Sequence, residues 1–182
     1  MSPDTILNIL LTMSPVRTAD LPKDQIGIYG LIDHTAAIRY IGSTSAENEN
    51  FRKRIHQRHR TGSETHSHYF SKKYNCGRMW RDRLSQQNHP DAKLSKDLRS
   101  AFIAHYCRAV FVPLSASKRD IESLEAATIR IAPRDAVLWN GSTETAYPEP
   151  TDLVEEMMQR LGFGASEREA VERQNRLYLA SL

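Results

Sequence analysis

A glutamate on the apolar face of a predicted helix is the residue whose position most directly suggests chemistry in this 182-residue chain. Segment 117–132 has the serine start signal and the following proline stop signal of a helix. At roughly 100° per residue, Glu125 falls inside the apolar stripe, whereas Glu122 lies at its border. A carboxylate that faces a core is seldom there without a metal ion, a cation or a proton. The pattern favours a functional Glu125, and the alternative is a structural ion pair with Arg130 or Arg134.

Cationic side chains take a similar position on an earlier predicted helix. We expect this helix to begin at a capping box, Thr44 to Glu47, and to end near residue 60. Its apolar stripe carries Arg54, Arg58 and His59. An arginine that faces a core needs a partner or a function. The alternative is that Arg54 and Arg58 extend from the edge of the stripe into solvent.

Two tyrosines are predicted to face each other across a β-hairpin. Segments 25–32 and 37–42 are rich in β-branched and aromatic residues and are separated by a turn signal, 33–36. A symmetric loop places Tyr29 directly opposite Tyr40, with Cβ atoms about 5 Å apart. Facing tyrosines are also a common packing pair, so position alone assigns them no function.

Basic residues gather in one part of the chain. Residues 51–83 contain ten lysines and arginines and two acids, whereas the whole chain has 25 basic and 22 acidic residues. Aromatic side chains lie between these cations. Such clustering is typical of a surface that contacts the phosphate backbone of nucleic acid. A solvated basic helix surface is an equally weighted alternative.

The composition is that of an ordinary globular chain, with 40% hydrophobic and 26% charged residues. No apolar run approaches the roughly 18 residues needed to cross a bilayer, so no membrane partner is expected. The two cysteines, Cys76 and Cys107, can form neither a disulfide framework nor a four-cysteine zinc site. The simplest expectation is a reduced, cytoplasmic protein.

The remaining segments are predicted to be mostly helical. They comprise a helix over 1–14, a linker to residue 22, helices over 66–88 and 93–104, a strand over 106–113, and two helices joined at 162–164. From residue 144 onward the tail carries eight acids and four bases. It is therefore not expected to contact DNA along its length.

The hairpin contains two triplets, Gly27-Ile28-Tyr29 and Tyr40-Ile41-Gly42, in this order and with the two tyrosines eleven positions apart. In these motifs the chain resembles the GIY-YIG nuclease superfamily, and the resemblance covers about residues 25–141. Three further segments are similar to family motifs: 50–55 to the first-helix motif with its arginine at Arg54, Leu124-Glu125 to the metal-binding glutamate motif, and Trp139-Asn140 to the closing asparagine motif.

Two positions depart from the family pattern. The histidine expected about one turn after the arginine would fall at Arg58, so His59 is predicted to serve, with His56 and His66 as alternatives. Ser43 follows the second triplet, where the DNA-repair incision nucleases of the family carry lysine. This difference favours the homing, restriction or phage-like branches.

The resemblance implies a metal-dependent DNA endonuclease that hydrolyses phosphodiester bonds. The implied metal ligand is Glu125, holding one Mg²⁺ or Mn²⁺ ion in the active site. In the implied catalytic set, Tyr29 helps to deprotonate the attacking water, and cations lower the pKa of the Tyr29 hydroxyl. Tyr40 and His59 align the water. Arg54 neutralises the phosphate charge, and Asn140 fixes the phosphate or the local loop. Arg58, Lys72 and Lys73 are the predicted DNA contacts.

The expected fold is α+β, a small three-stranded, mainly antiparallel sheet flanked by helices. It would comprise an N-terminal helix and linker over 1–24, a nuclease domain over 25–145 with an inserted helical segment 76–105, and an acidic helical extension over 146–182. One alternative is a non-cleaving nucleic-acid-binding protein on the same fold. Another is a toxin-like nuclease effector with a protein partner bound to its acidic tail. For the main interpretation too, a homodimer or a protein partner is expected to use the C-terminal helices.

Overall fold

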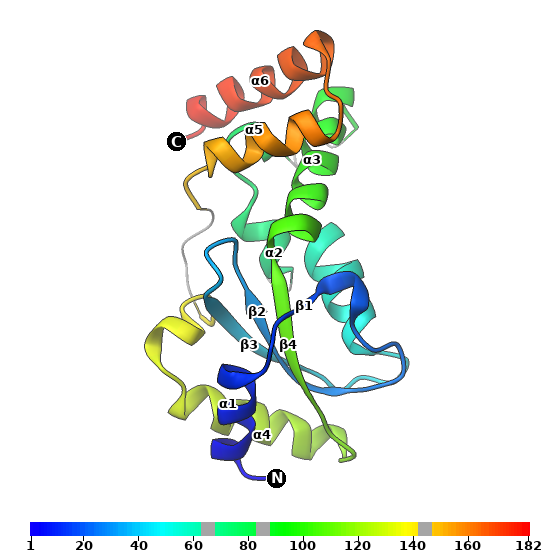
Figure 1. Ribbon diagram of the computed structural model, residues 1–182, viewed down its shortest axis with the longest axis vertical. Helices are drawn as coiled ribbons and strands as arrows, with labels where there is room; N and C mark the ends of the chain where they lie inside the picture. The colour runs from blue at the N-terminus through cyan, green and yellow to red at the C-terminus, as the bar shows by residue number, and fades with distance from the viewer. Residues whose placement is uncertain (63–67, 83–87, 142–146) are drawn as a thin grey trace. The chain divides into compact units, whose positions relative to one another are not determined.

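The computed structural model describes residues 1–62, 68–82, 88–141 and 147–182. The chain divides into two units, each built from two separate stretches of sequence (Figure 1). Unit 1 comprises Met1–Arg58 and Tyr106–Thr143, and unit 2 comprises His59–His105 and Glu144–Leu182. The expected insertion 76–105 and the C-terminal extension therefore belong to the same unit. That unit begins earlier than the expected insertion, at His59.

Unit 1 is built on a four-stranded antiparallel sheet with the strand order β1-β4-β2-β3. The strands are β1 (Val16–Arg17), β2 (Gly27–Ile32), β3 (Ile38–Thr44) and β4 (Arg108–Pro113). This arrangement confirms the α+β class and the three expected strands. The additional strand, β1, lies in the segment expected to be a linker. Two residues are too few to show the alternation by which a strand is recognised in a sequence.

Helices α1 (Pro3–Thr12) and α4 (Lys118–Ile131) cover one face of this sheet (Figure 1). Each begins at a serine whose side chain accepts a hydrogen bond from a backbone N–H in the first turn, Ser2 from Thr5 and Ser117 from Asp120. Aliphatic side chains of both helices and of three strands form the core here: Ile6, Leu10, Ile28, Ile32, Ile41, Val110, Val112 and Ile121. This core fixes which face of α4 is turned toward the sheet.

A helical segment beginning at Phe51 packs on the opposite face of the sheet. The Phe51 ring lies 5.1 Å from the Phe111 ring of β4. The expected capping box is wrong, because Thr44 ends β3 opposite Gly27 and is buried. Asn50 caps the helix instead, accepting a hydrogen bond from the Lys53 N–H at 2.8 Å. Residues Arg52–His59 adopt the wider π-helical form, which often marks a functional segment.

The register of the β2–β3 hairpin is shifted by two residues from the expected one. Tyr40 pairs with Leu31, and Tyr29 pairs with Gly42. The cause is the loop, which is asymmetric: Asp33 pairs with Ala37, Ala36 has a φ of 64°, and a bulge follows between Leu31 and Ile32. Direct opposition of the tyrosines is therefore wrong. A shift by two residues preserves the alternation of side chains, so both tyrosines do lie on one face.

Unit 2 is helical in its described residues. It contains α2 (Tyr69–Lys73), α3 (Pro90–Tyr106), α5 (Thr151–Arg160) and α6 (Ala165–Ala180), with a short 3₁₀ turn at Gly77–Met79. The helix expected over 66–88 is wrong within these residues, because α2 ends at Lys73. Asn75 redirects the chain there, since its side chain binds both the N–H and the carbonyl of Arg81. The predicted tail helices and the junction at 162–164 are confirmed.

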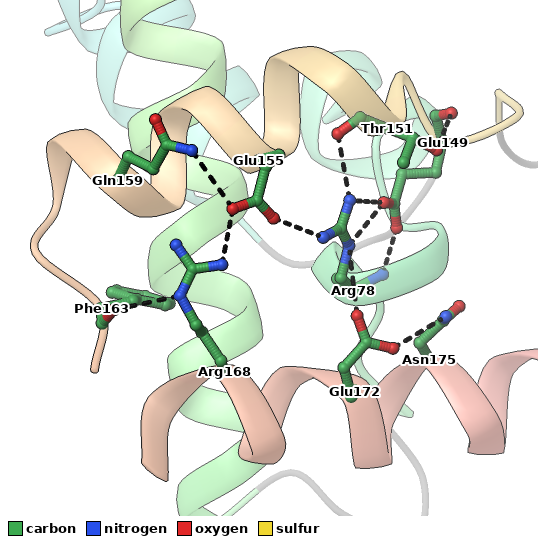
Figure 2. A network of polar contacts seen from close by, with 9 residues as sticks. All are labelled: Arg78, Glu149, Thr151, Glu155, Gln159, Phe163, Arg168, Glu172 and Asn175. Carbon is green, nitrogen blue, oxygen red and sulfur yellow. Dashed lines mark hydrogen bonds and ion pairs between the residues drawn. The ribbon is translucent and has the colours of Figure 1, made fainter. Parts of the chain in front are cut away.

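A buried arginine joins the two stretches of sequence that make up unit 2 (Figure 2). Arg78 is 7% exposed and its guanidinium donates to Glu149 at 2.7 Å, to Glu155 at 3.2 Å and to the Thr151 carbonyl at 3.0 Å. The Glu172 carboxylate of α6 lies 3.6 Å away. Three acids of the tail thus surround one cation of the middle segment.

None of the described helices has the length and apolarity that a membrane span requires.

Candidate active site

The two motif tyrosines lie beside each other on the face of the sheet that carries Phe51. Their ring centroids are 6.1 Å apart and the ring planes are inclined at 44°. Gly42 makes this arrangement possible, because a Cβ atom at this position would lie only 2.8 Å from the Tyr40 hydroxyl oxygen. The glycine opposite Tyr29 therefore leaves room for the Tyr40 ring to lean toward Tyr29. The close packing of the Tyr40 side chain thus explains why the second triplet ends in a glycine, Gly42.

Arg54 reaches the same pair of tyrosines from the helical segment. Its Nε donates a long hydrogen bond of 3.4 Å to the Tyr29 hydroxyl. Tyr29 is fully buried, and burial raises its pKa to about 12, although Arg54 and a hydrogen bond with Tyr40 act in the opposite direction. Arg54 thus lowers this pKa as expected, but the expected net lowering is not found in the protein chain by itself. Burial outweighs Arg54, so Tyr29 stays protonated at neutral pH.

Glu125 reaches the open edge of the sheet from α4. The Ser43 hydroxyl of β3 donates to its carboxylate at 2.5 Å. Burial raises the pKa of Glu125, while the Ser43 hydrogen bond and the Arg54 charge oppose that rise. Among the described residues its hydrogen-bond partner is Ser43, not Arg130 or Arg134. Glu122, one turn away, is 52% exposed, as its position at the border of the stripe predicts.

These side chains share one pocket in unit 1, with a volume of about 280 Å³. Tyr40, Arg54, Arg58 and Glu125 of the predicted site line it, and Tyr29 lies behind Tyr40 and Arg54. The wall holds three carboxylates and three cations: Glu49, Glu122, Glu125, Arg54, Arg58 and Lys118. Arg58 is itself paired with Glu49 at 3.2 Å. The pocket therefore combines a phenol, cations and carboxylates within a small volume.

Asn140 acts on the strand that carries Tyr40. Its side-chain oxygen accepts from the Ile41 N–H at 3.0 Å, and its side-chain nitrogen donates to the Ile41 carbonyl at 2.7 Å. The neighbouring Trp139 N–H donates to the Arg39 carbonyl at 2.8 Å. The asparagine thus replaces a missing neighbour strand at the free edge of β3. Of the two roles that the sequence left open, the structure favours fixing the backbone over contacting the phosphate.

The candidate histidines lie apart from these residues. His59 is fully buried, does not line the pocket, and accepts a hydrogen bond at Nδ1 from the Tyr69 N–H at 3.0 Å. His56 lies 2.9 Å from the Thr18 hydroxyl through its own Nδ1. His66 falls outside the described residues. The π-helical segment places Arg58, and not His59, at the pocket wall.

The two predicted lysine contacts differ in exposure. Lys72 is partly exposed at the end of α2 and is accessible to a phosphate. Lys73 is 3% exposed, so direct contact with a DNA backbone would require local rearrangement. The side chains of adjacent residues on a helix point in different directions, so the sequence does not show which of the two lysines is exposed. Lys72 and Arg58 remain the accessible members of the predicted set.

Ser43, Glu49 and Lys118 are among the lining residues of the pocket that sequence reasoning did not assign to the site. Ser43 was noted only as a departure from the family, although its alternation with Tyr40 along β3 places it on the α4 side of the sheet. Glu49 was assigned to a helix, yet it lies in the loop before Phe51 and its side chain is 7% exposed. Lys118 stands two turns before Glu125 on α4, and that spacing could have identified it.

The donor set at Glu125 fits a hard divalent cation. A carboxylate and a hydroxyl from two different elements meet here, and Glu122 lines the same pocket. Mg²⁺ is commonly bound through one or two carboxylates together with substrate phosphates and water. The described residues include no group of three or more histidine, cysteine, aspartate or glutamate side chains arranged around a metal position. Glu125 is the carboxylate that the family motif assigns to the ion, and this assignment stays a prediction.

Comparisons of the chain with protein-family models, with curated proteins and with solved structures find no match. The resemblance to the GIY-YIG superfamily therefore rests on the sequence motifs alone.

Proposed function

We propose that this protein is a metal-dependent DNA endonuclease with a GIY-YIG-type active site in unit 1. The observation that carries the proposal is the meeting of Tyr40, Arg54 and Glu125 in one pocket. They come from a strand, a helical segment and a second helix that are separated by up to 85 positions in the chain. Structural packing alone gives no reason for a phenol, a guanidinium and a carboxylate to converge on a solvent-accessible pocket.

The residues of the pocket suit hydrolysis of a phosphodiester bond. Arg54 presents a planar fork of donors that matches two non-bridging oxygens of a phosphate. A divalent ion held by Glu125 would neutralise phosphate charge and lower the pKa of the attacking water. Tyr40 lines the pocket and can align that water by a hydrogen bond. Ser43 orients the Glu125 carboxylate by donating to one of its oxygens.

The second layer of the site keeps these groups in place. Tyr29 is buried and protonated, so we assign it a positioning role through its hydrogen bonds with Arg54 and Tyr40. Asn140 secures the backbone of β3 between Tyr40 and Ser43. Catalytic geometry requires such support, because small displacements of reacting groups reduce rates strongly.

Plasmid cleavage tests the proposal directly. Purified protein is incubated with supercoiled plasmid or single-stranded DNA, in Mg²⁺ or in EDTA. Nicking or linearisation that requires the metal is expected. Arg54→Gln should reduce the rate by about 10²- to 10³-fold, the usual effect of removing a donor to transition-state charge.

A neighbouring lysine provides the matched control for this variant. Lys53→Gln removes the same charge from an exposed position that does not line the pocket, and should cleave like the wild type. Binding of DNA without metal-dependent cleavage by the wild-type protein would refute the nuclease and support the non-cleaving alternative.

A further inference from the structure

Unit 2 contains a second polar cavity, with a volume of about 650 Å³. Four cations line it, Arg60, Arg81, Lys93 and Lys96, together with a single carboxylate, Asp97. We call this feature the basic cavity. Its volume lies within the range of small-ligand sites. The lining residues alone carry a net charge of +3, which equals the formal net charge of the whole 182-residue chain. A cavity with this concentration of positive charge favours an anionic ligand.

The two arginines are held in place by their surroundings. Arg81 is only 8% exposed, and Asn75 fixes its backbone through hydrogen bonds of 2.8 Å and 3.3 Å. The Arg60 guanidinium donates to the Ser100 carbonyl at 3.4 Å, and its own carbonyl accepts from Ser71 at 2.8 Å. Such anchoring lowers the entropy lost when a ligand binds. The two arginines are thus the anchored part of the cavity, whereas Lys93 is 78% exposed and lies 4.0 Å from the Asp97 carboxylate.

One face of α3 supplies the remaining wall. Lys93, Lys96, Asp97 and Ser100 recur at the spacing of a single helix face. The opposite face of α3, which includes Leu98 and Phe102, is buried in the core of unit 2. The lining contains lysine, arginine, serine and asparagine and, among the described residues, no aromatic ring on which a base could stack. This chemistry recognises phosphate groups and carries no preference for a base.

We propose that the basic cavity binds phosphate groups of a nucleic-acid strand. The choice of ligand rests on the proposed nuclease function, whereas the phosphate chemistry rests on the cavity itself. The site would contribute affinity without sequence specificity. It includes Arg60 and Arg81 of the basic stretch identified in the sequence, together with lysines of α3 that lie outside that stretch.

Binding measured in EDTA tests this site without requiring cleavage. The affinity of a short labelled oligonucleotide is followed by fluorescence anisotropy at several salt concentrations. For the variant Lys93→Gln/Lys96→Gln, the slope of log affinity against log salt should fall by about one unit for each lost phosphate contact. The control Lys23→Gln/Arg119→Gln removes two exposed charges outside both pockets and should keep the wild-type slope.

A gain-of-affinity variant excludes misfolding as an explanation. Asp97→Asn removes the carboxylate from the wall and should tighten oligonucleotide binding by about two- to fivefold, the scale of one exposed charge interaction. An unfolded protein could not produce this result. Weaker or unchanged binding by Asp97→Asn would contradict the proposal.

Competition with AMP and with inorganic phosphate distinguishes the sources of the phosphate. Displacement of bound AMP by the oligonucleotide supports a nucleic-acid strand as the ligand of the basic cavity. Binding of AMP without binding of the oligonucleotide overturns this proposal in favour of a free nucleotide. Equal oligonucleotide binding by wild type and Lys93→Gln/Lys96→Gln overturns the basic cavity, even if plasmid cleavage is observed. Binding through the cavity without any cleavage refutes the nuclease and leaves the cavity supported.

Discussion

Ser43 and Arg54 act on the Glu125 carboxylate from two sides, and both favour its ionised form. Burial alone would favour the neutral acid, which binds a divalent cation poorly. The hydroxyl of β3 and the guanidinium of the helical segment therefore oppose the rise in the Glu125 pKa that burial causes, without reversing it. This balance makes Glu125, more than the exposed Glu122, the residue on which metal-dependent cleavage should depend.

We predict that Glu125→Gln abolishes cleavage while folding and DNA binding remain nearly unchanged. The substitution keeps the shape of the side chain and an acceptor for Ser43, so the free energy of unfolding should change by about 1 kcal/mol or less. The measurement is plasmid nicking in Mg²⁺ together with thermal melting. Glu122→Gln is the matched control and should be much milder. Nicking by Glu125→Gln at the wild-type rate would exclude Glu125 as the metal ligand.

The tyrosines offer a second prediction at this scale. Phenylalanine at position 29 or 40 keeps the ring packing, so stability should fall by about 1 kcal/mol, the net value of one hydrogen bond. Activity should fall by roughly 10²-fold, because Tyr29 positions Arg54 and Tyr40, Tyr40 aligns the water, and small displacements of reacting groups reduce rates strongly. Single-turnover cleavage at saturating DNA measures this loss. Full activity of Tyr29→Phe would remove Tyr29 from the site and leave water alignment to Tyr40.

Among the secondary-structure elements, β2, β3, β4 and α4 could be predicted because their patterns are local. Runs of β-branched and aromatic residues mark the three strands, and a serine cap marks the start of α4. The hairpin register could not be predicted from a symmetric loop, because the Asp33 side chain organises an asymmetric one. It accepts from the Thr35 and Ala37 N–H groups and places Ala36 at positive φ.

The start of the helix that carries Arg54 was misplaced for a similar reason. Thr44 and Glu47 satisfy a local capping pattern, yet β3 pairing with Gly27 extends the strand through Thr44. Long-range pairing took precedence over the local signal. The positions of Arg54 and Glu125 on inward faces nevertheless survive, because each depends on spacing within its own segment and not on the exact start of the helix.

The edge strand β3 carries the next prediction. Asn140→Ala removes both hydrogen bonds to Ile41, and we expect the free energy of unfolding to fall by about 2 kcal/mol, since two backbone groups lose their partners. The Ile41 amide should exchange its hydrogen faster, and cleavage should slow because β3 carries Tyr40. Urea unfolding and hydrogen exchange measure these effects. Asn8→Ala on the exposed side of α1 should be nearly neutral, and equal effects of both variants would contradict the role of Asn140.

For the whole molecule, charge explains how separate stretches of sequence form one unit. The tail is acidic and the middle of the chain is basic, so the sequence predicted a tail that does not contact DNA along its length, with a protein partner on the tail as an alternative. In unit 2 Arg78 of the middle segment lies among Glu149, Glu155 and Glu172 of the tail (Figure 2). This pairing joins residues more than 70 positions apart. No local pattern encodes it, so the sequence could not assign the insertion and the extension to one unit.

The last prediction concerns this cluster. Arg78→Ala leaves the buried Glu149 carboxylate without its cation, and we expect unit 2 to lose about 3 kcal/mol. This value is at the lower end for breaking a buried ion pair, because Glu155 and Glu172 remain partly exposed and can be hydrated. Native-state hydrogen exchange should show reduced protection in α5 and α6, with the amides of β2 and β3 less affected.

The surface pair of Arg160 with Glu156 provides the control for that experiment. Its atoms are 2.7 Å apart, like those of Arg78 and Glu149, but both side chains are about half exposed. Water therefore replaces the lost interaction, and Arg160→Ala should cost only about 0.5 kcal/mol. The two variants remove the same charge from unit 2 at the same pair distance, but Arg78 is buried and also contacts Glu155 and the Thr151 carbonyl. Equal loss of protection in both would show that the burial of Arg78 contributes nothing to joining the middle segment and the tail.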